Sequence, residues 1–188
     1  METNEKEAYQ KKMEAQLNEL NAKIDELKAT GEKAVGKVKA ELNEKIEELR
    51  PKQEAAQKKL KDLKKASDEA WEDLKVGMEK AWEELKGALD IVMSKYKQEY
   101  QKTVEAKLGE FGIHIDELKA KTEKVGVELK DELNKRIDEL LKKKEAAWKY
   151  LEELKSVGTD VWEDVKPKID AAVEALEKAY HQARSRFK

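Results

Sequence analysis

Two pairs of side chains have a spacing that would let them bind a metal ion from one face of a helix. Glu110 precedes His114 by four residues, and Glu177 precedes His181 by the same interval. Residues four apart are neighbours on a helix, and carboxylate and imidazole groups both bind divalent metals. Each pair offers only two ligands, and the Glu-x-x-His pattern of di-iron bundles is absent. We therefore expect solvent-exposed pairs and predict no metal site and no cofactor.

One glycine-containing segment has the outline of a phosphate-binding loop. Gly31-Glu-Lys-Ala-Val-Gly36-Lys37 reproduces the spacing of the two glycines and the lysine in a P-loop, where backbone amides hold the phosphates. Val38 occupies the position of the magnesium-binding Ser or Thr, and the sequence before the segment does not read as a strand. Nucleotide binding is therefore not predicted.

The remaining chemistry-bearing residues give no catalytic arrangement. The chain has no Cys, which excludes thiolate nucleophiles, disulfides and sulfur-based metal sites. Its 42 Asp and Glu residues are so numerous that pairs at acid–base distance must arise by chance, and no Ser-His-Asp arrangement accompanies them. We predict no catalytic residue and a protein that is not an enzyme.

The composition indicates what kind of elements position these residues. Among 188 residues, 44% are charged and 39% hydrophobic, with 8 Gly and 2 Pro. A chain so rich in Glu, Lys, Ala and Leu is typical of long helices and coiled coils. The predicted fold class is all-α.

The chain is an internal duplication. When it is aligned with itself at an offset of 91 residues, about 40 of the 91 paired positions are identical, which is far above chance. The repeats are residues 7–97 and 98–188, so the predicted domains are residues 1–97 and 98–188. Each is expected to form a helical hairpin.

Several short motifs recur in both repeats. Trp71-Glu-Asp73 returns as Trp162-Glu-Asp164, and Ser94-Lys-Tyr-Lys97 returns as Ser185-Arg-Phe-Lys188. With the polar hinge before each Trp-Glu-Asp triplet, these motifs resemble a family of small coiled-coil proteins that is widespread in bacteria and largely uncharacterised. The resemblance implies an elongated helical hairpin of unknown function, without catalytic residues.

Apolar residues in each repeat recur at intervals of three and four, which indicates one helical stripe before a hinge and a second after it. The hinges are Ser67-Asp68 and Gly158-Thr159-Asp160, where a helix can end and a new one can be capped. The first helix is predicted near residues 5–65, with a kink or interruption at Pro51. The stripe residues, in chain order, are Leu17, Leu20, Ile24, Leu27, Val35, Val38, Leu42, Ile46, Leu49, Ala56, Leu60, Leu63, Trp71, Leu74, Met78, Trp82, Leu85, Leu89, Val92 and Tyr96. Each has an apolar counterpart 91 positions later, except that the counterpart of Val35 is Val125, 90 positions later.

No Gly or Pro interrupts residues 89–103, so one central helix is predicted to cross the repeat junction, roughly from Asp68 to Lys155. The first helix would fold onto it with Leu49 opposite Leu85 and would continue until Leu27 faces Leu108. The result would be an elongated antiparallel coiled coil. The alternative is a compact four-helix bundle, formed if the chain breaks at the glycines of residues 108–113.

Four tryptophans are the most distinctive apolar side chains: Trp71, Trp82, Trp148 and Trp162. Three of them fall on the stripe of a predicted return helix, so burial is the first interpretation. The alternative is that these tryptophans form an interaction surface, on amphipathic helices that lie on lipid.

The predicted function is that of a non-enzymatic coiled-coil spacer or scaffold, whose partner is another protein or a second copy of the chain. The alternative is an amphipathic-helix protein that binds lipid or other hydrophobic surfaces reversibly, for example under stress. A membrane surface is thus a weaker prediction than a protein partner. Charges of both signs are interleaved, with 40 Lys and Arg against 42 Asp and Glu, so no nucleic-acid partner is predicted. The N-terminal residues lack the pattern of a signal peptide, and we expect a cytoplasmic location.

Overall fold

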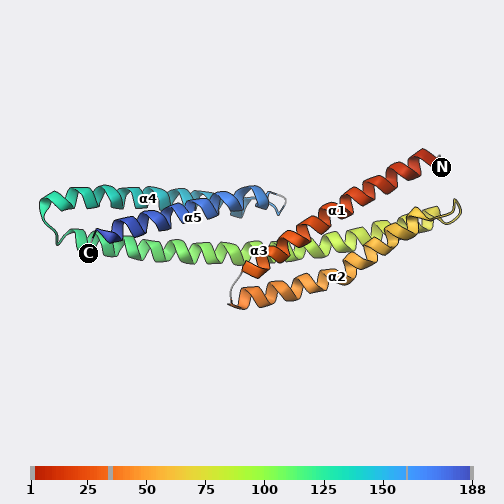
Figure 1. Cartoon of the computed structure of the whole chain (residues 1–188), viewed down its shortest axis with the longest axis horizontal. Coiled ribbons are helices and arrows are strands. Elements are labelled where there is room, and N and C mark those ends of the chain that lie inside the picture. Colours follow the sequence, from red (N-terminus) through yellow and green to blue (C-terminus); the bar gives the residue numbers. More distant parts are fainter. Residues whose placement is uncertain (1–2, 34–35, 160, 187–188) are drawn as a thin grey trace. The chain divides into compact units, whose positions relative to one another are not determined.

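The structure is a computed structural model that describes residues 3–33, 36–159 and 161–186 (Figure 1). Within these ranges the chain forms helices and no strands, so the predicted all-α fold is confirmed. The helices are α1 (Thr3–Lys33), α2 (Gly36–Lys64), α3 (Trp71–Thr122), α4 (Val127–Ser156) and α5 (Trp162–Ser185).

The chain divides into two compact units, residues 1–96 and 97–188. This division lies one residue from the boundary between the sequence repeats. Unit 1 contains α1, α2 and the first half of α3, whereas unit 2 contains the second half of α3, α4 and α5. The prediction that a helix crosses the junction is confirmed, because α3 continues without a break through residues 96 and 97.

The first helix is shorter than predicted. A single helix over residues 5–65 is wrong, because α1 ends at Lys33 and α2 begins at Gly36. The two helices are antiparallel neighbours: Gln53 Nε2 donates to Asn21 Oδ1 at 2.7 Å, and Lys64 Nζ lies 2.8 Å from Glu14 Oε1. Folding α1 back buries the apolar stripe within unit 1, whereas one long helix would leave half of its stripe uncovered.

The predicted central helix ends early, at the corresponding place in the second repeat. A helix from Asp68 to Lys155 is wrong, because α3 stops at Thr122 and α4 starts at Val127. The buried Thr122 hydroxyl donates to the Leu118 carbonyl at 2.8 Å, and the Val125 amide donates to the Thr122 carbonyl across the turn.

The break at the glycines of residues 108–113, on which the alternative four-helix bundle depended, does not occur. Gly109 and Gly112 lie inside α3, between the buried side chains of Leu108 and Ile115. Two glycines cost helix propensity of roughly 1 kcal/mol each relative to Ala, and burial of the neighbouring side chains outweighs that cost. Pro51 likewise does not interrupt α2, which runs through it.

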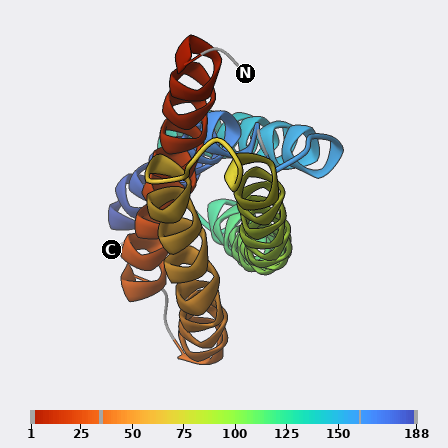
Figure 2. The same cartoon turned by 90° about the vertical axis from the view of Figure 1, so that its right-hand side faces the viewer.

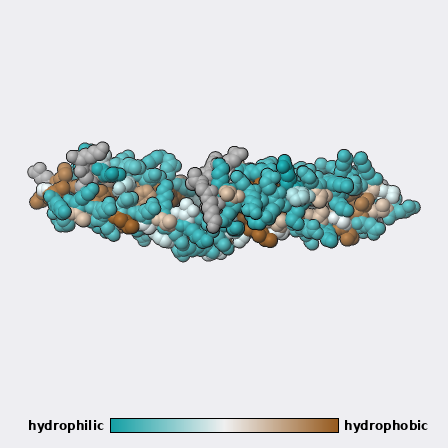
Figure 3. Space-filling model, turned by 90° about the horizontal axis from the view of Figure 1, so that it is seen from below, coloured by the Kyte–Doolittle hydropathy of each residue, from teal (hydrophilic) through white to brown (hydrophobic). Residues whose placement is uncertain are grey.

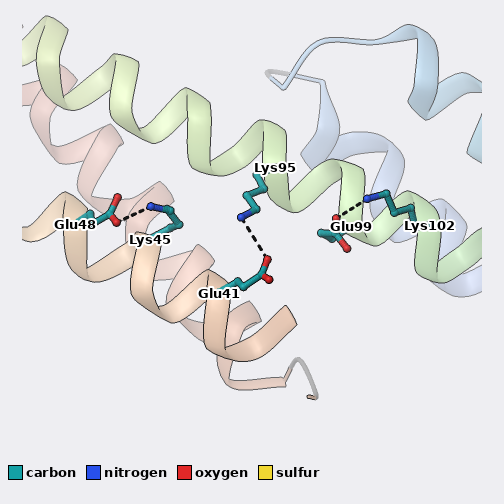
Figure 4. Close-up of polar contacts among 6 residues, drawn as sticks. All are labelled: Glu41, Lys45, Glu48, Lys95, Glu99 and Lys102. Atoms are coloured by element: carbon teal, nitrogen blue, oxygen red, sulfur yellow. Dashed lines mark hydrogen bonds and ion pairs between the residues drawn. The ribbon is translucent and has the colours of Figure 1, made fainter. Parts of the chain in front are cut away.

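The predicted antiparallel register of α2 on α3 is confirmed. Lys95 Nζ of α3 lies 3.3 Å from Glu41 Oε2 of α2, and Figure 4 shows the two side chains pointing toward each other. The Lys59 side chain lies over Gly77, near the other end of the pair. Both contacts agree with the expected pairing of Leu49 with Leu85.

In both units the first helical segment lies parallel to the third. Tyr9 of α1 contacts residues near the start of α3, and Tyr100 of α3 contacts residues near the start of α5. In Figure 2 the α2–α3 turn faces the viewer, and the red, brown and olive ribbons of unit 1 are seen around it. Each unit is therefore an up-down-up arrangement of three helices.

The predicted stripes supply the cores of both units. In unit 1 the buried residues are Met13, Leu17, Leu20, Ile24, Leu27, Leu42, Ile46, Leu49, Ala56, Leu60, Leu63, Trp71, Met78, Leu85, Leu89, Val92, Met93 and Tyr96. In unit 2 they are Val104, Leu108, Phe111, Ile115, Leu118, Leu133, Ile137, Leu140, Ala147, Leu151, Leu154, Trp162, Val165, Ile169, Val173, Leu176, Tyr180 and Ala183. Four predicted stripe residues are exceptions: Leu74, Trp82 and Val125 are half-buried, and Leu129 is 44% exposed. The predicted stripe positions Val35 and Phe187, and the side chain of Val38, lie outside the described part of the structure.

Charged side chains dominate the outer faces. Hydrophilic residues cover most of the face drawn in Figure 3, and hydrophobic ones appear in small separate groups. Many charges pair locally along one helix, such as Lys102 with Glu99 at 2.7 Å (Figure 4). Exposed pairs of this kind stabilise a helix by only a few tenths of a kcal/mol.

Candidate functional site

The four tryptophans separate into two classes. Trp71 and Trp162 are 2% and 3% exposed, so their interpretation as core residues is confirmed and neither offers a surface in the folded chain. Trp82 and Trp148 are half-buried, each beneath a lysine of its own helix: Lys86 Nζ lies 5.1 Å from the Trp82 ring, and Lys155 Nζ lies 5.8 Å from the Trp148 ring. Only Trp82 and Trp148 remain available as contacts for a partner.

Around Trp71 the structure assembles an aromatic cluster between α1 and α3. The Tyr9 ring meets the Trp71 ring edge-on, with centroids 6.0 Å apart, and the Tyr9 hydroxyl donates to Glu79 at 3.0 Å. Lys75 Nζ lies 5.3 Å from the centre of the Tyr9 ring. Burial, together with the hydrogen bond to Glu79, raises the pKa of Tyr9 well above its usual range. We call Tyr9, Trp71, Lys75 and Glu79 the aromatic clamp of unit 1.

The same clamp recurs in unit 2, between α3 and α5. Tyr100 meets Trp162 edge-on at 5.0 Å, donates from its hydroxyl to Asp170 at 2.6 Å, and lies beneath Lys166 at 5.2 Å. All four positions are offset by 91 residues from those of unit 1. The repeats have thus retained a complete set of contacts that fixes the first helix to the third.

A lysine ties each clamp to the turn that precedes the third helix of its unit. Lys6 pairs with Asp68 in the α2–α3 turn, and its ammonium lies 5.0 Å from the Trp71 ring. The counterpart, Lys97, donates to the carbonyl of Val157 at the end of α4. The partner differs, but the lysine holds the same turn in both repeats.

The aromatic clamps were missed in the sequence, although a signal for them was present. Tyr9 and Lys75 are each identical to their counterparts in the second repeat, Tyr100 and Lys166. Identity alone does not show contact, because the tyrosine of each clamp lies more than 60 positions before its other residues. The two parts meet only when the first helical segment of the unit lies beside the third. Edge-to-face aromatic pairs and hydrogen bonds of this kind stabilise a fold by roughly 1 kcal/mol each.

The two Glu-His pairs meet at one pocket of unit 2. It has a volume of about 280 Å³ and lies between α3 and α5. Its lining residues are Lys107, Glu110, Phe111, His114, Glu177, Tyr180, His181 and Arg184. We call this the histidine pocket. Sequence spacing predicted each pair, but their meeting depends on α5 lying beside α3.

The side chains of the histidine pocket are arranged for packing and charge balance. The His114 ring stacks on Tyr180, with centroids 5.0 Å apart and an angle of 21° between the planes. Lys107 Nζ lies 3.2 Å from Glu177 Oε2, so this carboxylate already has a cationic partner. The buried His114 Nδ1 has no hydrogen-bond partner in the described structure, and Glu117 Oε2 lies 3.7 Å from it. Among the described residues no three His, Asp or Glu side chains are placed to hold a metal ion.

The histidine pocket has no counterpart in the first repeat. His114 and His181 correspond to Lys23 and Asp90, and Tyr180 corresponds to Leu89. Unit 1 has instead a groove of about 310 Å³ between α1 and α2, lined by Glu14, Leu17, Asn18, Asn21, Gln57, Leu60, Lys61 and Lys64. The repeats therefore share their internal clamps and differ on their surfaces.

The P-loop interpretation is not supported by the backbone. Gly31 lies inside α1 and its Cβ position would contact Asn43 Oδ1 of α2 at 2.9 Å, so it is packed between two helices. The side chains of residues 32–38 lie outside the described part of the structure.

Comparison of the chain with protein-family models, with curated proteins and with solved structures gives no match. The resemblance to small bacterial coiled-coil proteins therefore stays a prediction. In the described part of the chain, no helix has an apolar stretch long enough to cross a bilayer.

Proposed function

We propose that this protein is a non-enzymatic structural module, a spacer or scaffold that contacts other proteins through its outer faces. The observation that supports this most strongly is the burial of the apolar stripes. Each stripe is buried within its own unit, and both units hold their helices together with the same aromatic clamp. What the folded chain offers to a partner is a pair of related, largely charged surfaces carried on helices.

Trp82 and Trp148 are the residues that we propose as partner contacts. Each is half-buried, and each belongs to a different unit. Tryptophan is enriched among residues that dominate protein–protein binding energy, because its large ring is buried at little entropic cost. In contrast to Trp71 and Trp162, neither ring must leave a core to make such a contact.

A reversible binder of lipid or other hydrophobic surfaces is the second candidate. It is favoured by three exposed apolar side chains of α3: Val76, Ile91 and Ile113 are 63%, 70% and 63% exposed. Binding of this kind would bury exposed apolar area on a membrane surface.

Mixing the protein with vesicles separates the two candidates. We expect that vesicles of phosphatidylcholine with phosphatidylglycerol leave helicity and tryptophan emission unchanged, and that the protein stays in the supernatant on sedimentation. Co-sedimentation with a blue shift in emission would contradict the scaffold proposal. If it occurred, Ile91→Lys with Ile113→Lys should abolish it, whereas the charge-matched changes Gln57→Lys and Asn134→Lys, at exposed polar positions of α2 and α4, should not.

A further inference from the structure

Two apolar residues beside the α3–α4 turn continue the buried stripe of α3, but the fold leaves both of them partly exposed. Ile115, Leu118 and Thr122 are buried on α3, and the same three-and-four spacing leads on to Val125 and Leu129 before it reaches the buried Leu133. Val125 is only half-buried, and Leu129 is 44% exposed. In one unbroken helix all of these side chains would lie on the same face.

The turn that displaces them is short, and the amides of Lys124 and Val125 donate to the carbonyls of Lys121 and Thr122. Gly126, the residue before α4, has an extended backbone (φ −66°, ψ 158°) and has no side chain that could cap the helix. Helix α4 begins beyond the end of α3 in Figure 1, and Val127 at its start is 81% exposed. An ion pair between Lys130 and Glu123, 2.7 Å apart, closes the turn, but an exposed pair of this kind contributes little.

The register of α3 against α4 points to what would bury Leu129. Glu105 of α3 pairs with Lys155 of α4 at 2.6 Å, and Lys144 of α4 lies over Gly112 of α3. Midway in the sequence between Glu105 and Lys155 lies residue 130, and midway between Gly112 and Lys144 lies residue 128. If two copies of an unbroken α3–α4 helix ran antiparallel in this register, Leu129 of one copy would face Leu129 of the other, and Val125 would face Leu133.

We propose that α3 and α4 join into one helix through residues 123–126, and that two copies of the chain then exchange their α4–α5 hairpins. Opening the turn uncovers Leu108, Phe111 and Ile115, and the hairpin that fits this surface is an identical one from a second chain. The contacts inside unit 2 are all regained in the exchanged dimer, including the aromatic clamp. The monomer and the exchanged dimer therefore differ only at the turn and at the new Leu129 contact. Domain exchange costs little free energy when the two forms share nearly all of their contacts.

Gly126 offers a matched pair of variants to test this. Gly126→Ala favours a continuous helix, since Ala has the higher helix propensity. Gly126→Pro fits the present turn, because φ is already −66° and no hydrogen bond from the Gly126 amide occurs in the described structure. Proline inside a merged helix would remove a hydrogen bond and clash with the preceding turn.

The full chain and both variants would be refolded from urea at high and low protein concentration and separated by size exclusion with light scattering. We expect a dimer fraction in the native chain that grows with concentration, a several-fold larger fraction for Gly126→Ala, and none for Gly126→Pro. Circular dichroism checks that each variant is folded. The proposal is overturned if the native chain and Gly126→Ala both stay monomeric, or if Gly126→Pro dimerises as well as the native chain.

Cross-linking shows whether a dimer is the exchanged one. Because the chain has no Cys, Leu129→Cys and Val127→Cys each introduce a single thiol. In the exchanged dimer the two Leu129→Cys thiols meet at the symmetry axis, whereas Val127 points away from that contact. We expect rapid disulfide formation in the dimer fraction of Leu129→Cys only, and equal rates for the two variants would contradict the exchange.

Discussion

At the scale of single residues, the aromatic clamps make separable contributions to stability. The hydroxyl of Tyr9 donates to Glu79 and that of Tyr100 donates to Asp170, while both rings pack edge-on against a tryptophan. Tyr9→Phe and Tyr100→Phe remove only the hydrogen bond, so we expect each to lower the free energy of unfolding by about 0.5–1.5 kcal/mol. The two losses should add, because the clamps are in different units. Urea unfolding measures this, with Tyr150→Phe as a control that should change little.

The Lys6–Asp68 pair predicts a pH dependence at the same scale. The Lys6 ammonium, through its hydrogen bond and charge, holds the pKa of the exposed Asp68 carboxyl below its usual value. A lowered folded-state pKa means that the stabilisation is fully present above the ordinary Asp pKa of about 4 and is lost as the pH falls through the folded value. NMR titration of the carboxyl carbon should show this low midpoint, and Lys6→Gln should return it to the ordinary range. An unchanged midpoint in Lys6→Gln would show that the pair does not form.

At the scale of the helices, two glycines that lie inside helices should respond differently to alanine. A Cβ at Gly109 meets nothing within 4 Å, whereas at Gly31 it would come within 2.9 Å of Asn43 Oδ1. Gly109→Ala should therefore raise the free energy of unfolding by about 0.5–1 kcal/mol through helix propensity. Gly31→Ala should gain less, because Asn43 must shift. A loss of stability in Gly109→Ala would argue that α3 is not a regular helix at this point.

Much of the helical architecture could be predicted from the spacing of apolar residues. The stripes identified Leu85 and Leu176 as core, and the hinge at Ser67 correctly placed α2 against α3. The end of α1 at Lys33 and the end of α3 at Thr122 could not be predicted, because the apolar stripe continues beyond both. Their cause is tertiary: folding back covers the stripe within one unit, a gain that local propensity does not contain.

The candidate sites were predictable only in part, for the same reason. Helical spacing alone places Glu110 beside His114, and Glu177 beside His181. The predicted long central helix would have placed α5 opposite residues of α4 only, far from His114. The histidine pocket forms because α3 ends at Thr122 and α5 lies parallel to it, as the Phe111–Tyr180 contact at 5.8 Å shows.

At the scale of the whole chain, duplication has kept the interior and changed the exterior. Both units bury the same stripes, while the histidine pocket occurs in unit 2 and the amide-lined groove in unit 1. In the scaffold function that we propose, two related but unequal units would contact two different partner surfaces. This interpretation depends on both units being complete folds with a shared helix between them.

Hydrogen exchange, measured by mass spectrometry on the monomer fraction, tests that arrangement most directly. Amides in a stable helix exchange slowly, whereas those of an exposed turn exchange near the rate of an unfolded chain. We predict slow exchange through residues 92–104, where α3 crosses from unit 1 to unit 2, and fast exchange at residues 123–126. Fast exchange across residues 92–104 together with protection of residues 123–126 would contradict the division into two three-helix units joined by α3.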